Sequence, residues 1–177
     1  MMFGSDIRFP YLTERGQASK PPAQPLLVDC ANGVGAQTLE KAAPYLKPAI
    51  TFIPVNTEMY TRGALNNGCG ADFVKTQQRL PPSLRDSVKP NQRACSFDGD
   101  ADRIIYFYHD EMGNFRLLDG DKISGLVASF IVELVKGAGL EGKLNVGVVQ
   151  TAYANGASTK FLKEVCIYSS CWNFEPG

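Results

Sequence analysis

The chain has 177 residues, of which 44% are hydrophobic and 20% charged, as is usual for a water-soluble globular protein. Its 18 basic residues balance its 18 acidic ones, which gives no electrostatic reason to expect nucleic acid or an anionic membrane as a partner. The longest apolar stretch, at residues 123–135, is shorter than the roughly 20 residues that a membrane span needs. We therefore expect a soluble protein without nucleic-acid or membrane partners.

Five cysteines are scattered along the chain without a C-x-x-C pair, and the first residues lack the charged and apolar regions of a signal peptide. Both features indicate free thiols in a reducing compartment. We therefore expect a cytosolic (cytoplasmic) protein.

The N-terminal third begins with residues 1–24, which contain prolines and no hydrophobic period, and we expect a linker or ragged end there. A short apolar run predicts a buried strand at residues 26–29. A glycine-bearing turn, a helix that stops before Pro48, and a second strand at residues 50–55 follow. This strand–helix–strand order predicts an α/β sheet.

The middle of the chain predicts one short helix, at residues 71–78, within a Gly- and Pro-rich region. Apolar runs then predict strands at residues 94–97 and 104–108, on either side of an aspartate-rich loop. A polar turn follows, and the chain returns as a strand at residues 115–118.

The last third opens with Asp119 and Asp121, which we interpret as capping residues of the helix that follows. Apolar side chains at residues 123–135 repeat with the spacing of a helix. A further buried strand is predicted at residues 146–149, and a short helix at residues 158–165.

The strongest chemical signal is the loop Ser96-Phe-Asp-Gly-Asp-Ala-Asp-Arg103. In an extended segment alternate side chains point the same way, so Asp98, Asp100 and Asp102 can converge. Three anions so close together repel unless a cation lies among them, and Mg2+ is a hard ion that prefers oxygen ligands. We therefore predict a Mg2+ site, with a solvated acidic turn as the alternative.

Two other aspartate-based sites fit the loop less well. An EF-hand would need Gly and Glu at its sixth and twelfth positions, where this chain has Arg103 and His109. A haloacid-dehalogenase-like phosphatase would show a paired Asp-x-Asp after a strand, whereas here a third aspartate follows. The phosphatase is kept as an alternative.

The run from Phe97 to Arg103 resembles the metal loop of the α-D-phosphohexomutases. Residues 28–36, 65–74 and 148–156 resemble the eukaryotic branch of that superfamily that acts on N-acetylglucosamine phosphates. The resemblance extends over about residues 25–165.

This resemblance implies that Asp98, Asp100 and Asp102 hold Mg2+ together with a phosphoserine. The phosphoserine would convert the sugar-phosphate substrate to a 1,6-bisphosphate and take back the other phosphate. The implied isomerase activity interconverts N-acetylglucosamine 6-phosphate and 1-phosphate, which feeds UDP-N-acetylglucosamine synthesis. Arg103 would contact phosphate, with a salt bridge to a neighbouring aspartate as the alternative.

The sequence also departs from the superfamily's pattern. It has no Thr-Ala-Ser-His-Asn-type phosphoserine loop and no Glu-x-Asn-Gly sugar loop. We therefore expect a truncated or alternatively spliced product, or a faulty gene model, that lacks activity alone. The competing hypothesis is a non-catalytic fragment that binds metal weakly or self-associates through an incomplete third domain.

The implied fold is a mixed, mainly parallel sheet flanked by helices. We expect residues 25–143 to form a domain like the superfamily's second one, which would carry the metal loop. Residues 144–165 would supply the opening strand and helix of the third domain, and residues 166–177 a divergent tail.

Overall fold

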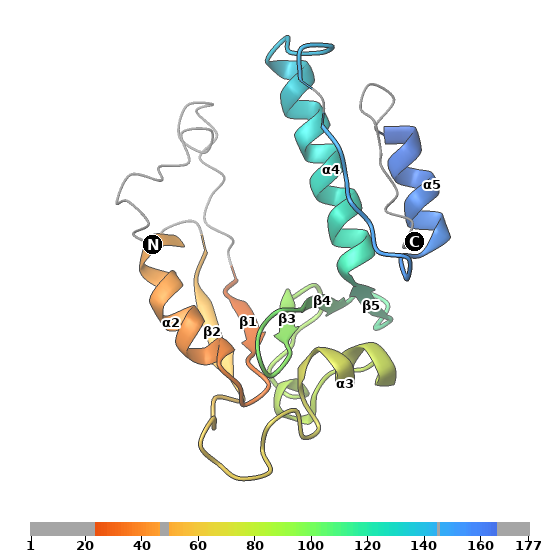
Figure 1. The fold of residues 1–177 in the computed structure, drawn as a ribbon. Coiled ribbons are helices and arrows are strands. Elements are labelled where there is room, and N and C mark those ends of the chain that lie inside the picture. Colours follow the sequence, from red (N-terminus) through yellow and green to blue (C-terminus); the bar gives the residue numbers. More distant parts are fainter. Residues whose placement is uncertain (1–23, 47–49, 145, 166–177) are drawn as a thin grey trace. The chain divides into compact units, whose positions relative to one another are not determined.

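A computed structural model describes residues 24–46, 50–144 and 146–165 (Figure 1). The chain divides into two compact units, residues 1–116 and 117–177. The linker predicted at the N-terminus, except for its last residue, and the predicted C-terminal tail lie outside the described residues. Among the helices of the described ranges, none is long and apolar enough to cross a membrane.

The first unit is built on a five-stranded sheet with the order β2-β1-β3-β4-β5. β1 (Leu26–Asp29) lies between β2 (Phe52–Val55) and β3 (Ala94–Phe97) and runs parallel to both. β3 pairs in antiparallel fashion with β4 (Ile104–His109), and β5 (Phe115–Leu118) is the last strand. The mixed sheet confirms the predicted α/β fold class, although β2 begins two residues later than expected.

The core of this unit is formed around β1, all four residues of which are buried. A strand with neighbours on both sides and helices near its faces is expected to read as a continuous apolar run. One cluster of the core joins β1 to α2 (Gly35–Leu46) and to β3, and consists of Leu26, Val28, Cys30, Leu39 and Cys95. α2 connects β1 to β2, as the strand–helix–strand pattern predicts.

The other helix of the first unit, α3 (Gly70–Gln77), contacts β3 and β4 and buries Val74 completely. It ends at Gln78, which adopts a left-handed conformation with φ of 49°. A short 3-10 helix, η1 (Pro82–Leu84), follows and buries Leu84. The helix predicted at residues 71–78 is therefore confirmed, shifted by one residue.

The second unit contains α4 (Gly120–Gly137) and α5 (Gly156–Val165), which contact each other. They approach closely, because a Cβ added at Gly125 would lie 3.3 Å from the ring of Phe161. This packing differs from the domain boundary predicted between residues 143 and 144. α4 belongs to the same compact unit as α5, rather than to the unit of the sheet.

The strand predicted at residues 146–149 is wrong. These residues carry no strand assignment, and Val149 is 78% exposed. An apolar run becomes a strand only when a neighbouring strand satisfies its backbone groups. In the described part of the second unit, the only strand is the end of β5, which reaches no further than Leu118.

Candidate metal centre

The aspartate-rich loop joins two paired strands. Phe97, the last residue of β3, is paired with Ile104, the first residue of β4. Residues 98–103 therefore form a short loop whose two ends are held by the antiparallel ladder. Such a connection fixes the place of the loop at the end of the sheet, close to α3.

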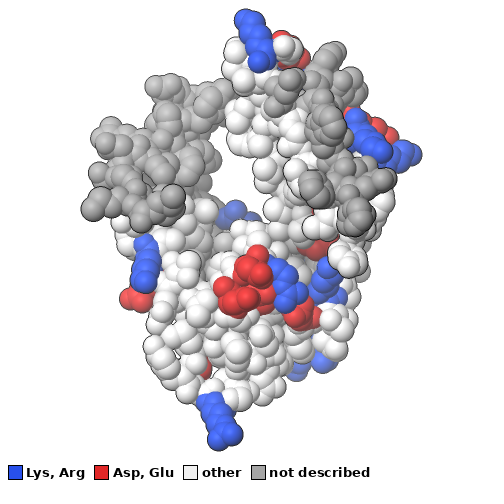
Figure 2. All heavy atoms as spheres, in the orientation of Figure 1, with Lys and Arg blue, Asp and Glu red and all other residues white. Residues whose placement is uncertain are grey.

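Asp98, Asp100 and Asp102 each offer a carboxylate oxygen, and these atoms lie within 4.8 Å of one another. Asp98 is buried, whereas the other two are at the surface, and Figure 2 shows a compact group of acidic side chains with basic ones against it. The carboxylates converge as expected, but not through an extended segment. The loop turns at Ala101, which has a φ of 59° and whose amide donates to the carbonyl of Asp98 at 3.1 Å.

The loop packs closely against the turn after β1 and against Leu65. The amide of Val34 donates to the carbonyl of Gly99 at 3.1 Å. A Cβ added at Gly33 would lie 2.1 Å from that carbonyl oxygen, and one added at Gly99 would lie 2.8 Å from Cδ1 of Leu65. The group that a side chain at position 33 would meet is backbone and cannot move aside, so glycine is required there, whereas at position 99 the side chain of Leu65 would have to shift.

A buried carboxylate ties the segments around the loop together. Oδ1 of Asp29 accepts hydrogen bonds from the amide of Ala31 at 3.0 Å and from Nδ2 of Asn56 at 2.7 Å. Its Oδ2 accepts from the amide of Gly70 and from Oγ of Ser96, both at 2.7 Å. Asp29 thereby links the turn after β1, the start of α3 and β3, a role that the sequence analysis missed.

Arg103 closes the loop by hydrogen-bonded ion pairs with two aspartates, and its Nε also lies 3.8 Å from Oδ1 of a third, Asp102. Its Nε donates to Oδ2 of Asp98 at 2.6 Å, and its amide donates to Oδ1 of Asp98 at 3.1 Å. Its Nη1 and Nη2 donate to Oδ1 and Oδ2 of Asp72 at 2.6 and 2.9 Å. The alternative of a salt bridge to a neighbouring aspartate is therefore observed, and the phosphate contact stays a prediction. Asp72, on α3, was not predicted.

Neighbouring groups shift the pKa values of Asp98 and Asp102 in opposite directions. Burial favours the neutral form of Asp98, but hydrogen bonds from Arg103 outweigh it and hold the pKa of Asp98 below its usual range. A hydrogen bond shared with Asp98, together with the charges of Asp100 and Asp98, raises the pKa of Asp102. Ionising Asp102 beside Asp98 is therefore unfavourable unless further positive charge is supplied.

The second acidic pair, Asp119 and Asp121, is used differently. Asp119 accepts from the amide of Lys122 at 3.3 Å and caps α4, which confirms the cap predicted at this residue. Asp121, predicted to cap the same helix, instead lies inside its first turn. Oδ2 of Asp121 accepts from the amide of Asn155, just before α5, at 3.0 Å. Within the described ranges, neither belongs to a group of three or more side chains that could hold a metal.

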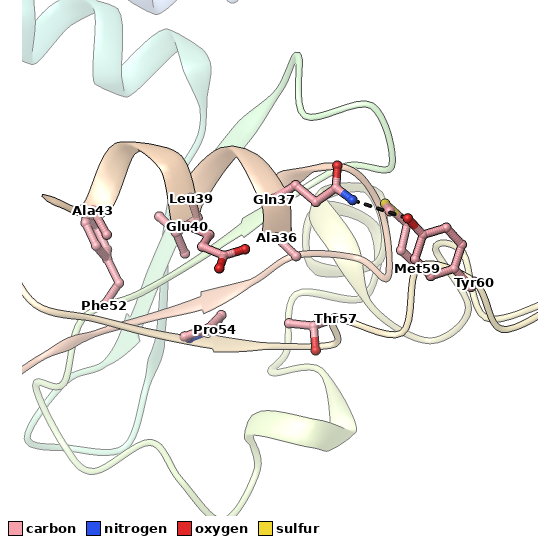
Figure 3. A pocket seen from close by; sticks show the side chains of 10 residues that line it. All are labelled: Ala36, Gln37, Leu39, Glu40, Ala43, Phe52, Pro54, Thr57, Met59 and Tyr60. Carbon is pink, nitrogen blue, oxygen red and sulfur yellow. Dashed lines mark hydrogen bonds between the residues drawn. The ribbon is translucent and has the colours of Figure 1, made fainter. Parts of the chain in front are cut away.

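A separate hollow of about 430 Å³ lies against α2 and β2 (Figure 3). Most of its lining is apolar, and Nε2 of Gln37 reaches across to the hydroxyl of Tyr60 at 3.4 Å. Its lining residues are Ala36, Gln37, Leu39, Glu40, Ala43, Phe52, Pro54, Thr57, Met59 and Tyr60. With one carboxylate and no convergent charges, it offers less chemistry than the aspartate loop.

Two family models match the chain. Domain II of phosphoacetylglucosamine mutase AMG1 matches residues 11–105, and domain III of the same family matches residues 119–173. The first match begins inside the predicted N-terminal linker, and the second extends into the predicted tail. The gap between the matches contains the division between the two compact units.

Individual relatives agree with the family models. The phosphoacetylglucosamine mutase of Homo sapiens is 48% identical over 157 residues, which are 89% of this chain and 28% of the relative. Phosphoacetylglucosamine mutase 1 of Schizosaccharomyces pombe is 49% identical, over 83% of this chain and 28% of the relative. A crystal structure of Aspergillus fumigatus N-acetylphosphoglucosamine mutase with GlcNAc-6P and magnesium has a TM-score of 0.76 and 46% identity, over 87% of this chain and 31% of that one. The chain thus spans less than a third of each of these proteins.

Proposed function

Because this chain belongs to the phosphoacetylglucosamine mutase family, we propose that it carries the metal centre for interconverting N-acetylglucosamine 6-phosphate and 1-phosphate. The observation that carries the proposal is the convergence of Asp98, Asp100 and Asp102 in one loop. The reaction is an isomerisation by phosphoryl transfer, and its product would enter UDP-N-acetylglucosamine synthesis. The Aspergillus fumigatus relative in complex with GlcNAc-6P and magnesium supports the substrate class and the ion.

The donor set of the loop fits Mg2+. Carboxylate oxygens are its preferred ligands, and the pKa of Asp102 is raised by the hydrogen bond shared with Asp98 and by the charges of Asp100 and Asp98. When bound, Mg2+ would act as a Lewis acid and offset the charge of the transferring phosphoryl group. Arg103 holds Asp98 in place, while Asp100 and Asp102 remain exposed for coordination.

Arg103 is proposed to contact a phosphate of the substrate or of the donor. Its side chain is 55% exposed, and its planar guanidinium suits paired phosphate oxygens. Nη1 and Nη2 each use one N–H in the pair with Asp72, which leaves one N–H on each nitrogen outside that pair. A phosphate can therefore bind beside Asp72 or take its place.

We further propose that a phosphoserine donates the phosphoryl group and that residues 1–177 alone do not catalyse the reaction. The sequence contains no Thr-Ala-Ser-His-Asn-type run, and the human relative is matched over only 28% of its length. Phosphoryl transfer requires donor, acceptor and charge-stabilising groups to be held together. Family membership leaves the haloacid-dehalogenase alternative without support.

A non-catalytic role in association is the second candidate function, and the surface of α4 favours it. Leu126 and Phe130 are large apolar residues and are 65% and 57% exposed. Apolar side chains so exposed on one helix favour contact with another chain. We propose self-association through this helix, so Phe130→Lys should shift the sedimentation of the purified chain towards the monomer. Equal sedimentation of both proteins would contradict it.

A cytosolic location is also proposed, since Cys30, Cys69 and Cys95 are free.

Titration calorimetry tests the metal site. Because three carboxylates and water form a weak oxygen site, we expect Mg2+ or Mn2+ to bind with a Kd of about 0.1–10 mM. Asp100→Asn is the cleanest variant, because this exposed residue makes no contact on which the loop's fold is seen to depend. It should weaken binding, whereas Asp86→Asn, an exposed aspartate outside the loop, should not. Equal binding by the Asp100 variant, or no binding at tens of millimolar, would refute the site.

Two assays test the activity. The purified chain is incubated with N-acetylglucosamine 6-phosphate, Mg2+ and a 1,6-bisphosphate primer, and we expect no product above that of an Asp98→Ala, Asp100→Ala double variant. In the complementary assay, residues 26–116 replace the matching segment of the human enzyme. This chimera should retain mutase activity and lose it on Asp100→Asn. A folded chimera that is inactive without that substitution would contradict the proposed function.

A further inference from the structure

We propose that Asp72 is a positioning residue of the metal loop, an inference that rests on the proposed Mg2+ site. Asp72 lies in the first turn of α3, 31 residues before Arg103 in the sequence. It lies outside the group of converging carboxylates. It acts through Arg103, whose orientation it fixes, and Arg103 in turn holds Asp98.

The guanidinium of Arg103 is divided between two carboxylates. Its Nη1 and Nη2 face Asp72 in a paired, two-bond contact, at 2.6 and 2.9 Å. This arrangement directs Nε towards Oδ2 of Asp98, which it reaches at 2.6 Å. A planar group held along one edge cannot rotate without breaking both bonds, so Asp72 determines where Nε points.

Asp72 can serve as an anchor because the start of α3 is fixed. The amide of Gly70 donates to Oδ2 of Asp29 at 2.7 Å, and Asp29 is completely buried. A Cβ at Gly70 would lie 2.9 Å from that of Ala31, so the helix start also packs tightly against the turn after β1. An acidic side chain in the first turn is further favoured by the helix dipole. Although 64% exposed, Asp72 therefore has a fixed backbone.

Removing Asp72 would leave Arg103 with ion-pair partners only inside the metal loop. Nε of Arg103 already lies 3.8 Å from Oδ1 of Asp102. Without Asp72, the free Nη groups have Asp102 as a nearby carboxylate partner, and the guanidinium would lie between Asp98 and Asp102. Its positive charge would then compete with a cation for the same oxygens. Asp72 thus keeps Arg103 at the outer edge of the site.

The test is a double-mutant cycle on Mn2+ affinity, measured from the electron paramagnetic resonance signal of free Mn2+ in the full chain. Partners of metal ligands typically contribute 10–100-fold to affinity, and for this exposed one we expect Asp72→Asn to raise the Kd about three- to tenfold. Asp72→Glu restores the carboxylate and should stay within about twofold of the unsubstituted chain. In an Arg103→Ala background, Asp72→Asn should have little effect, because the residue through which it acts is gone.

The cycle separates positioning from simple charge. If Asp72 acted only by its long-range charge, its substitution would weaken Mn2+ binding equally with and without Arg103, and this result would overturn the inference. An unchanged Kd in Asp72→Asn would do the same. If the unsubstituted chain bound no Mn2+, the metal site itself would be refuted, and this inference with it. Thermal unfolding without metal checks that each variant is folded at the temperature of the measurement.

Discussion

Two segments of this chain carry aspartates at alternate positions, and the fold uses them in opposite ways. Between β3 and β4, Asp98, Asp100 and Asp102 bring their carboxylates within 4.8 Å of one another. At the start of α4, Asp119 and Asp121 separate, and each carboxylate accepts a hydrogen bond from a backbone amide near the start of a helix. The first arrangement concentrates negative charge, whereas the second uses it to satisfy amides that would otherwise lack partners.

The difference lies in the main chain around each segment rather than in the acidic residues. The loop at residues 98–103 is closed by a strand pair and held by a backbone contact that leaves no room for a side chain at Gly33. At the first residue of α4, nothing lies within 4 Å of a Cβ added at Gly120. Aspartate spacing alone therefore does not specify a metal site, because a tightly supported turn must also bring the carboxylates together.

Of the substitutions that test this difference, Gly33→Ala should have the largest effect on stability. The added methyl group would meet the carbonyl of Gly99 at 2.1 Å, so the backbone must move. We expect a loss of about 3 kcal/mol in the free energy of unfolding, by analogy with overpacked sites, together with loss of Mg2+ binding. Gly120→Ala is the matched control and should change stability by less than about 1 kcal/mol. Urea unfolding followed by circular dichroism measures both, and similar losses would break the comparison.

Truncation of one aspartate from each segment should differ in the same direction. Asp98→Ala removes the buried carboxylate that accepts from Nε and the amide of Arg103, and we expect a loss of about 2 kcal/mol, as for hydrogen bonds to charged groups. Asp119→Ala removes a cap whose hydrogen bond is 3.3 Å long, and should cost only about 0.5–1 kcal/mol. A larger loss at Asp119 in urea titrations would show that the loop depends less on its carboxylates than the cap does.

Stabilisation by Mg2+ should depend on one segment only. With a Kd near 1 mM, 10 mM Mg2+ would stabilise the folded chain by about 1.4 kcal/mol, since it binds only the folded state. Asp100→Asn should abolish this gain in thermal unfolding, and Asp121→Asn should preserve it. A gain that Asp121→Asn removed instead would place the ion at the other segment.

The smallest expected effect is on pH dependence. The pKa of Asp98 is lowered, so its ionised form favours folding above the ordinary aspartate pKa, and this contribution is lost as the pH falls through the lowered value. Asp102 has the opposite sign. Its pKa is raised, so its ionised form opposes folding at neutral pH, and the opposition is relieved as the pH falls through the raised value. As the pH is lowered, carboxyl NMR titration should show Asp102 gaining its proton before Asp98. Bound Mg2+ should lower the raised pKa of Asp102. Titration of Asp98 first would contradict the assignment.

The sequence predicts the local elements of the fold well because their signals are local. Buried apolar runs mark β1, β3 and β4, and the helical repeat at residues 123–135 marks α4. The same reasoning fails at residues 146–149, where an equally apolar run forms no strand. Apolarity reports that a segment can be buried in a sheet, whereas the presence of a partner strand is a property of the tertiary structure.

The metal loop could be predicted only in part. Its aspartates stand out in the sequence. The turn at Ala101 that brings them together, however, needs a left-handed conformation that alanine rarely adopts, so the sequence does not predict it. Asp72 and Asp29 could not be connected to the loop by spacing. Their contacts join residues 31 and up to 67 positions apart. Both lie within stretches that resemble the superfamily, which is the only sequence signal that pointed to them.

The four hydrogen bonds of Asp29 have a consequence for how the site is acquired during folding. Its donors come from Ala31, Asn56, Gly70 and Ser96, so the buried carboxyl group lacks some of its hydrogen-bond partners until all four segments have assembled. A partly folded chain with Asp29 already buried is therefore disfavoured, which makes assembly of the sheet cooperative. The metal loop should therefore not form on its own. A synthetic peptide of residues 94–105 would contain all three aspartates but would not hold their carboxylates together.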